Sequence, residues 1–246
     1  MRAALALAAW LAAAAPAWGC VESAAVAVGE ALHYDIAWMG IPAGRATIAV
    51  EPPVAHRDRT AVRLVATARS NAFVDAFYEV RVEVESLWDC QGRYSLLFTH
   101  RGREGRRVRD RRYVFDLPRQ EVRREWAGDP VERFPLLSPV QDPFSILFEA
   151  RVRPLEVGRT FTLEAFEGRR RWEVDVQVLR RQRVTVPAGT FDAIVVKPLL
   201  KFEGVFQQKG DVVVWLTDDE RRIPVRMESK VRIGRVAAEL TSFVRP

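Results

Sequence analysis

The chain has 246 residues and 48% hydrophobic content, which is enough for one or two domains with a sizeable core. Its formal net charge is +6, and all but four of the 38 Lys and Arg residues are arginine. Such a skew is explained by a GC-rich genome, so we expect no nucleic-acid partner. A cationic surface is still attracted to anionic membrane or polysaccharide surfaces.

Residues 1–19 have the pattern of a secretory signal peptide: one arginine, an uncharged run rich in Ala and Leu, and then the small-residue pattern Ala-Trp-Gly. The run is too short and too rich in Ala for a transmembrane span, and no later segment approaches the length of one. We therefore expect an exported protein, located in the periplasm or associated with the outer membrane, with residues 20–28 as an N-terminal linker.

The two cysteines leave three states open. Cleavage after Gly19 would make Cys20 the first mature residue, which suggests lipidation, although Ala17 and Trp18 depart from the usual lipobox. An exported compartment also permits a disulfide between Cys20 and Cys90. Two unpaired thiols are the third alternative.

Two similar segments predict turns between strands. "GIPAGRATIAV" (residues 40–50) and "TVPAGTFDAIVV" (residues 185–196) each place Pro-Ala-Gly before a strand pattern. Pro42 and Pro187 fix φ for the second position of a turn, and Gly44 and Gly189 supply the fourth, where a left-handed backbone is often required. We interpret the two as independent uses of the same turn chemistry.

Period-two alternation dominates the rest of the chain, at residues 59–70, 78–88, 170–180, 223–233 and 235–244. Such strands pack one face on a core and expose the other, which is typical of antiparallel sheets. Only "SPVQDPFSILFEARV" favours a helix, from about Asp142 to Arg151, with Asp142 as a cap and Pro143 at the first position. The proline-rich residues 126–140 are the candidate connection between two halves of one domain spanning 29–245.

The segment "HRGREGRRVRDRRYVFD" (residues 100–116) contains seven arginines, and its glycines suggest a hairpin tip. Arginine makes bidentate contacts to phosphate, so the segment is a candidate site for anionic lipid headgroups or phosphosugars. The alternative is a solvated edge hairpin whose charges oppose aggregation. The candidate residues are Arg101, Arg103, Arg106, Arg107 and Arg109.

No pattern predicts catalysis, a metal site or a cofactor. His33, His56 and His100 lie far apart in the sequence without ligand spacing, no serine lies in Gly-x-Ser-x-Gly, and no glycine-rich phosphate loop follows a strand. The acidic segment "TDDERR" (residues 217–222) lies between strand patterns and is interpreted as a hairpin turn rather than a calcium loop. We therefore do not expect an enzyme.

Four segments carry a family resemblance: "GEALHYDIAWMGIPAGRATI", "VQDPFSILFEAR", "VPAGTFDA" and "VVVWLTDDERRIPVRMESKVRIGRVAAEL". Together they resemble an exported bacterial family known only as a domain of unknown function, number three-one-zero-eight. The resemblance covers nearly all of residues 29–243 and keeps the motif order. It implies an exported β-rich protein, similar at the level of fold to the half-barrels of lipoprotein carriers. It transfers no catalytic residue.

The expected fold is mainly β: an antiparallel, strongly curved sheet or open half-barrel with one short helix at one end. A single short helix cannot cover the apolar faces of so many strands. We therefore expect a non-enzymatic envelope protein whose concave sheet binds a lipid, another hydrophobic ligand or a partner. A structural envelope scaffold and an enzyme of unrecognised type are the alternatives.

Overall fold

The computed structural model describes residue 20 and residues 23–202, 205–207, 212–231 and 233–246; the expected signal peptide lies outside them. The described chain is mainly β, with two short helices, α1 (Ala72–Asp75) and α2 (Ser145–Arg151). The N-terminal strands are β1 (Ala31–Trp38), β2 (Ile41–His56), β3 (Arg59–Ser70), β4 (Val80–Asp89), β5 (Ser95–Glu104), β6 (Arg107–Asp116), β7 (Glu121–Trp126) and β8 (Glu132–Pro135). The C-terminal strands are β9 (Thr160–Glu167), β10 (Arg170–Val186), β11 (Gly189–Phe202), β12 (Val205–Gln207), β13 (Val212–Thr217), β14 (Pro224–Lys230) and β15 (Arg235–Val244).

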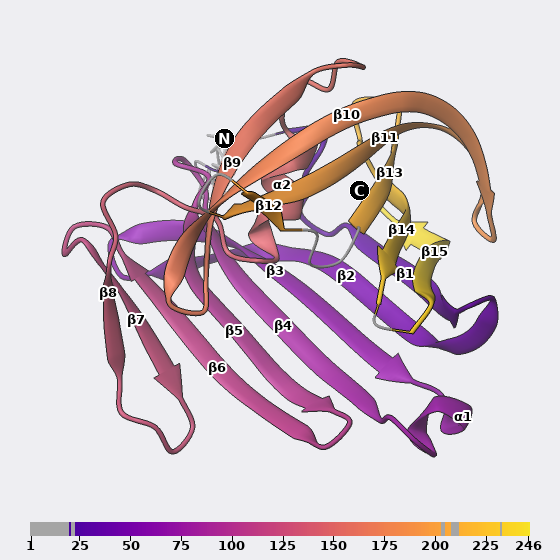
Figure 1. The fold of residues 1–246 in the computed structure, drawn as a ribbon. Helices are drawn as coiled ribbons and strands as arrows, with labels where there is room; N and C mark the ends of the chain where they lie inside the picture. The colour runs from indigo at the N-terminus through magenta and orange to yellow at the C-terminus, as the bar shows by residue number, and fades with distance from the viewer. Residues whose placement is uncertain (1–19, 21–22, 203–204, 208–211, 232) are drawn as a thin grey trace, which may run out of the picture.

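These strands form one antiparallel sheet with the order β8-β7-β6-β5-β4-β3-β2-β1-β15-β14-β13-β11-β10-β9, while β12 pairs with β11 off this path. The pairing of β1 with β15 joins the N-terminal and C-terminal strands. The sheet curves strongly, so that β9, β10 and β11 arch over α2 while β2 to β8 lie beneath it (Figure 1). The expected curved, open antiparallel sheet is confirmed.

The two edge strands, β8 and β9, are not hydrogen-bonded to each other in the described residues. The segment that follows β8 partly fills the space between them, because the Gln141 N–H donates to the Glu164 carbonyl at 2.7 Å and the Phe166 N–H donates to the Gln141 carbonyl at 2.8 Å. The ring of Phe166 also packs against that of Phe134 on β8, with centroids 5.7 Å apart. The segment after β8 and the Phe134–Phe166 contact therefore cover this side of the sheet, although β8 and β9 do not pair with each other in the described residues.

Helix α2 begins at Ser145, three residues later than expected, and ends at Arg151 as expected. The Asp142 carboxylate accepts the backbone N–H groups of Phe144 and Ser145 at 2.7 and 2.8 Å, so it does cap the start of the helix. The sequence interpretation missed α1, which is only four residues long and is capped by the Asn71 side chain.

The Pro42–Gly44 turn prediction is wrong. Both residues lie inside β2, and the hairpin turn is formed by Met39 and Gly40, which have φ values of 50° and 82°. Two consecutive positive φ values match the right-handed twist of the strands that a two-residue hairpin joins. At the second segment, Pro187 follows the end of β10 and Gly189 begins β11 with φ 134°.

Cys20 and Cys90 form a disulfide, with Cα atoms 4.2 Å apart and a sequence separation of 70 residues. The bond ties the start of the described chain to the end of β4, where Cys90 is 2% exposed in the main core. A sulfur in this bond cannot also carry a lipid thioether, so the structure holds the second of the three states considered for Cys20.

Candidate functional site: an open cavity beside α1

The inner face of the sheet changes character from the α2 end to the α1 end. Near α2, the inner positions of β1, β2 and β3 hold the buried side chains of Leu32, Ile48 and Leu64. Closer to α1, the inner positions of β2 and β3 hold glycine, alanine and serine. Residues paired across antiparallel strands point to the same side, so Gly44 lies with Ser70 and Ala46 with Ala68. These small inner residues are Gly44, Ala46, Ala66, Ala68 and Ser70.

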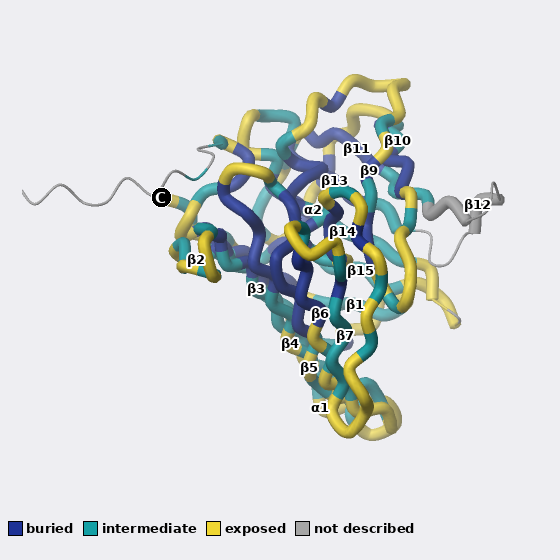
Figure 2. Tube along the Cα trace, turned by 90° about the vertical axis from the view of Figure 1, so that its left-hand side faces the viewer, coloured by how far each residue is buried: buried dark blue, intermediate teal, exposed yellow. Residues whose placement is uncertain are grey.

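An open cavity of about 1200 Å³ lies at the α1 end, and two of these small residues, Ala68 and Ser70, line it. Its walls are the ends of β1 and β3, the segment 74–80, the hairpin between β5 and β6, and the turn between β14 and β15. Figure 2 shows the buried chain gathered around α2, with intermediate and exposed chain toward α1. The apolar residues of the wall include Ile36, Ala43, Ala68, Val80 and Val236.

Large apolar side chains surround the mouth of this cavity and point to solvent. Phe73, Phe77 and Tyr78 are 56%, 58% and 48% exposed. The Phe73 and Phe77 rings pack edge to face, and Phe77 also contacts Trp38 on β1, with centroids 6.1 Å apart. We call the exposed apolar residues at this end the rim: Met39, Ile41, Phe73, Phe77, Tyr78, Val231 and Ile233.

The rim joins three separate segments of the chain. The Trp38 indole N–H donates to the Ile233 carbonyl at 2.8 Å, which connects the β1–β2 turn with the β14–β15 turn. A Cβ on Gly105 would lie 2.6 Å from the Tyr78 ring, so only glycine lets this ring rest on the tip of the β5–β6 hairpin. The arginine-rich hairpin therefore lies directly beside the rim.

Each acidic side chain of the cavity wall is matched by an arginine. The hydrogen bond from the Arg81 guanidinium, followed by that from Ser70, holds the pKa of Asp75 below its usual range, so this carboxylate stays ionised. The ion pairs are Asp75–Arg81 at 2.5 Å, Glu104–Arg109 at 3.1 Å and Glu79–Arg103 at 3.7 Å.

Two further arginines of the wall, Arg106 and Arg107, have no ion-pair partner in the described part of the chain. Arg69 has none either, but it alternates along β3 with the inner residues Ala68 and Ser70. Since the acidic groups are already paired, the charge left over at the mouth is positive. The site thus combines an apolar interior with unpaired guanidinium groups at its edge, a combination that suits an apolar molecule carrying an anionic group.

The structure divides the five arginines that the sequence proposed as one patch. Arg107 pairs with Glu104 and Arg109 with Gly102 across the hairpin, on the inner face, and both line the cavity together with Arg106 in the turn. Arg101 and Arg103 lie on the outer face, where Arg101 pairs with Asp110 at 3.4 Å. Alternate residues of a strand point to opposite faces of the sheet. The position of the hairpin tip, at residues 105–106, therefore decides which arginines lie on each face.

The sequence interpretation missed the rim entirely. Phe73, Phe77 and Tyr78 lie in "NAFVDAFYEV", where an Asn followed by apolar residues at helical spacing was the available signal. The turn residues Val231 and Ile233 gave no comparable signal, because apolar residues next to a strand are usually assigned to its buried face.

A buried polar cluster lies at the α2 end, away from the cavity. The second carboxylate oxygen of Asp142 accepts hydrogen bonds from the hydroxyls of Ser86 and Ser95 at 2.5 and 2.7 Å. Burial raises the pKa of the Asp142 carboxyl, whereas these hydrogen bonds and those from the backbone act in the opposite direction. None of the three residues lines the cavity, so the cluster serves to hold the helix start against β4 and β5.

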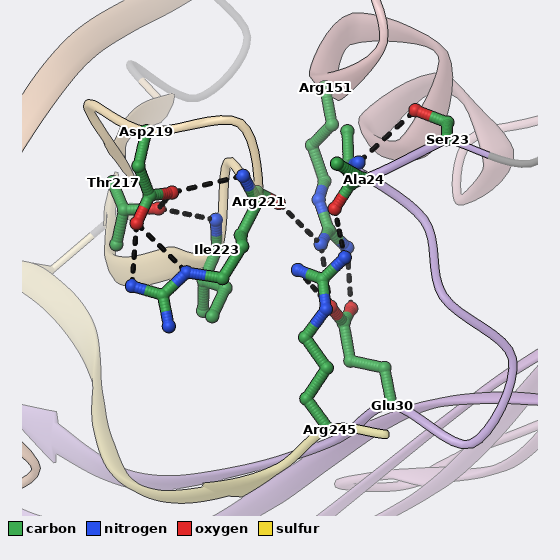
Figure 3. A network of polar contacts seen from close by, with 10 residues as sticks. Ser23, Ala24, Glu30, Arg151, Thr217, Asp219, Arg221, Ile223 and Arg245 are labelled. Atoms are coloured by element: carbon green, nitrogen blue, oxygen red, sulfur yellow. Dashed lines mark hydrogen bonds and ion pairs between the residues drawn. The ribbon is translucent and has the colours of Figure 1, made fainter.

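A second polar network joins the two ends of the described chain to α2 (Figure 3). Arg151 donates two hydrogen bonds, at 2.7 and 2.8 Å, to the Glu30 carboxylate, and both side chains are fully buried. Arg151 also donates to the Arg221 carbonyl at 3.2 Å, and Arg245 lies 3.6 Å from Glu30. Asp219, from the "TDDERR" segment, accepts bonds from Thr217 and Arg221 and so stabilises the predicted hairpin turn.

The described residues contain no group of three or more His, Cys, Asp or Glu side chains placed to hold a metal ion. Neither of the two helices is long and apolar enough to cross a membrane. Fold and site together define the class: a β-rich, barrel-like protein with an open apolar cavity at one end of a curved sheet.

The chain belongs to the family described as a protein of unknown function, DUF3108, whose model matches residues 33–241. The resemblance identified from the sequence is thereby confirmed. None of the curated proteins compared with the chain matches it in sequence.

Among solved structures, a β-barrel-like protein of the domain of unknown function DUF1849 from Brucella abortus has the same kind of fold, with a TM-score of 0.65 at 11% identity. The alignment covers 90% of this chain and 99% of that chain. A putative exported protein with a YmcC-like fold from Bacteroides fragilis matches with a TM-score of 0.35, 14% identity and coverage of 89% and 97%. A putative lipoprotein from Parabacteroides distasonis matches with a TM-score of 0.38, 12% identity and coverage of 88% and 95%.

Proposed function

We propose that this protein is an exported, non-enzymatic envelope protein that holds a lipid or similar hydrophobic ligand in the cavity beside α1. The observation that carries the proposal is the open, largely apolar cavity of about 1200 Å³. Ligand sites for drug-sized molecules usually measure about 300–1000 Å³ and are lined mainly by apolar side chains. An acyl chain gains roughly 0.8 kcal/mol for each CH₂ group that it buries.

Export is supported by the signal-peptide pattern of residues 1–19 and by the Cys20–Cys90 disulfide. Disulfides persist in oxidising compartments such as the bacterial periplasm. We propose the periplasm or the periplasmic face of the outer membrane as the location, because an acyl chain must be shielded from water there.

The charges of the mouth support a ligand with an anionic group. Arg106 and Arg107 line the cavity without an ion-pair partner in the described residues, and a bound carboxylate or phosphate would supply one. The acyl chain would then lie along the wall formed by small inner residues such as Ala68. The buried Asp142 cluster does not open into the cavity, which is why we propose binding rather than catalysis.

A cavity-filling variant tests ligand binding. Ala68→Leu adds three carbons to the cavity wall, whereas the control Ala49→Leu makes the same change on the outer face of β2, opposite Val65. Binding of the apolar fluorophore phenylnaphthylamine, and its displacement by palmitate, should weaken about tenfold in Ala68→Leu and remain unchanged in Ala49→Leu. Gentle purification from the native envelope should also yield an extractable lipid detected by mass spectrometry.

A matched pair of ligands tests the preference for anions. Arg107→Gln should weaken the binding of palmitate about fivefold relative to the binding of hexadecanol, which has the same chain length without the charge. Arg101→Gln on the outer face serves as the control. A wild-type protein with no extractable lipid and no fluorophore binding would refute the proposed function and favour the scaffold alternative.

A further inference from the structure

The cavity accounts for only some of the exposed apolar side chains of the rim. Phe77 and Tyr78 contribute to the cavity wall, but Met39, Ile41 and Phe73 do not line it, and they are 57%, 44% and 56% exposed. A ligand inside the cavity therefore does not account for them. A cluster of exposed apolar side chains on a protein in water usually marks a surface that another apolar phase covers.

The rim is built from turns, the four-residue helix α1 with the residues that follow it, and Ile41 at the start of β2. None of the described rim residues belongs to an edge strand of the sheet. Met39 lies in the β1–β2 turn and Ile41 directly follows it, Phe73 lies in α1, and Ile233 lies in the β14–β15 turn, at the same end of the molecule (Figure 1). Such tips offer no row of backbone donors and acceptors to pair with a peptide strand. They do present apolar side chains that can enter the boundary between headgroups and acyl chains of a bilayer.

Positive charge borders these apolar tips. Tyr78 rests on Gly105, so the hairpin tip that carries Arg106 and Arg107 adjoins the rim. Neither arginine has an ion-pair partner in the described residues. Apolar and aromatic side chains beside unpaired cations complement an anionic bilayer, in which the acyl chains lie beneath negatively charged headgroups.

We propose that the rim docks this protein on an anionic phospholipid bilayer, with the mouth of the cavity facing the membrane. Met39, Ile41 and Phe73 enter the interface, while Arg106 and Arg107 contact lipid phosphates. This orientation lets an acyl chain pass between bilayer and cavity without crossing water. Docking itself needs no ligand in the cavity and so does not depend on the proposed function.

Cosedimentation with vesicles tests the proposal. Wild-type protein should bind vesicles of phosphatidylethanolamine and phosphatidylglycerol, should not bind vesicles of pure phosphatidylcholine, and should be released by high salt. The rim variant Ile41→Ser/Phe73→Ser should bind the anionic vesicles at least about tenfold less tightly. Arg106→Gln/Arg107→Gln should weaken binding by about fivefold per arginine.

A matched control changes two exposed apolar residues elsewhere, Leu137→Ser and Val157→Ser, which should leave vesicle binding unchanged. Equal vesicle binding by the rim variant and wild type would overturn the proposal, and so would absence of wild-type binding. Loss of a wild-type dimer in the rim variant, without any vesicle binding, would instead assign the rim to contact between two copies of the chain.

The two proposals fail separately. Ile41 and Phe73 do not line the cavity, so the rim variant should keep wild-type affinity for phenylnaphthylamine. Ala68→Leu should conversely keep vesicle binding. Vesicle binding without fluorophore binding would refute the cavity function and leave docking intact.

Discussion

At the α2 end of the sheet, inner side chains such as Leu32 and Leu64 fill the space around the helix, and a fully buried ion pair joins Glu30 to Arg151. At the α1 end, the same strands carry alanine and glycine on their inner face, a cavity opens, and aromatic side chains point to solvent. The difference teaches that one curved sheet can be filled by side chains at one end of its strands and open at the other. Stability should depend mainly on the α2 end, and binding on the α1 end.

The largest effect is expected at the buried ion pair. Arg151→Met leaves the Glu30 carboxylate buried, with Arg245 at 3.6 Å as its one remaining ion-pair partner among the described residues. It should lower the free energy of unfolding by about 3–5 kcal/mol in urea titrations. The exposed pair Arg159–Glu156 is the control, and Arg159→Met should cost less than about 1 kcal/mol.

A double variant keeps this test informative if Arg151→Met does not fold. Glu30→Gln/Arg151→Met removes the stranded charge and should recover part of the stability. The rim variant Ile41→Ser/Phe73→Ser should unfold close to the wild-type midpoint. A rim variant that is less stable than Arg151→Met would contradict the expectation that stability depends mainly on the α2 end.

The strands could largely be predicted from the sequence, because alternation is a local signal. The alternating run at residues 59–70 coincides with β3, and Val174, Val176 and Val178 of the run at residues 170–180 are all buried. The family resemblance covered nearly the same residues as the family match. These features depend on neighbours in the chain, which a single sequence contains.

The candidate site could be predicted only in part. The arginine hairpin was visible, but its division between two faces depends on where the turn falls. The cavity wall takes Ala43 from β2 and Ala68 and Ser70 from β3, which come together only when the two strands pair in their particular register. The rim joins segments nearly 200 residues apart, such as Trp38 and Ile233, so no local pattern reveals it.

An intermediate effect on stability is expected at the glycines of the β1–β2 hairpin. At this end of the sheet the side chains leave a cavity, but the backbones of β2 and β3 approach closely. A Cβ on Gly44 would lie 2.2 Å from the Arg69 carbonyl oxygen, so Gly44→Ala should cost about 1–3 kcal/mol of stability. Gly40 has φ +82° and nothing within 4 Å of an added Cβ, so Gly40→Asn should cost only a few tenths of a kcal/mol.

Chemical denaturation of both variants tests the corrected turn assignment. Gly40→Val should cost more than Gly40→Asn, because a β-branched residue tolerates a positive φ poorly, whereas Gly44→Asn should be no better than Gly44→Ala. The reverse order would favour a turn at Pro42–Gly44 and would contradict the close approach of β2 to β3 at Gly44.

The smallest effect is expected from His100, which lies on the inner face of β5 between the filled and the open regions. Burial lowers its pKa below the ordinary value of 6.5; nearby Glu104 opposes the shift, while Arg109 and Arg111 add to it. As pH falls through about 6.5 toward the lower folded pKa, the unfolded chain binds a proton that the folded chain does not, so stability decreases.

His100→Gln should therefore show a smaller loss of stability between about pH 7.5 and pH 5.5 than wild type. His56, whose pKa is also lowered, chiefly by burial, leaves a residual dependence in the variant, and His33→Gln on the exposed surface is the control substitution. Unfolding titrations with the same pH dependence in wild type and His100→Gln would mean that water reaches this position freely, and the boundary between the filled and open regions would then lie closer to α2.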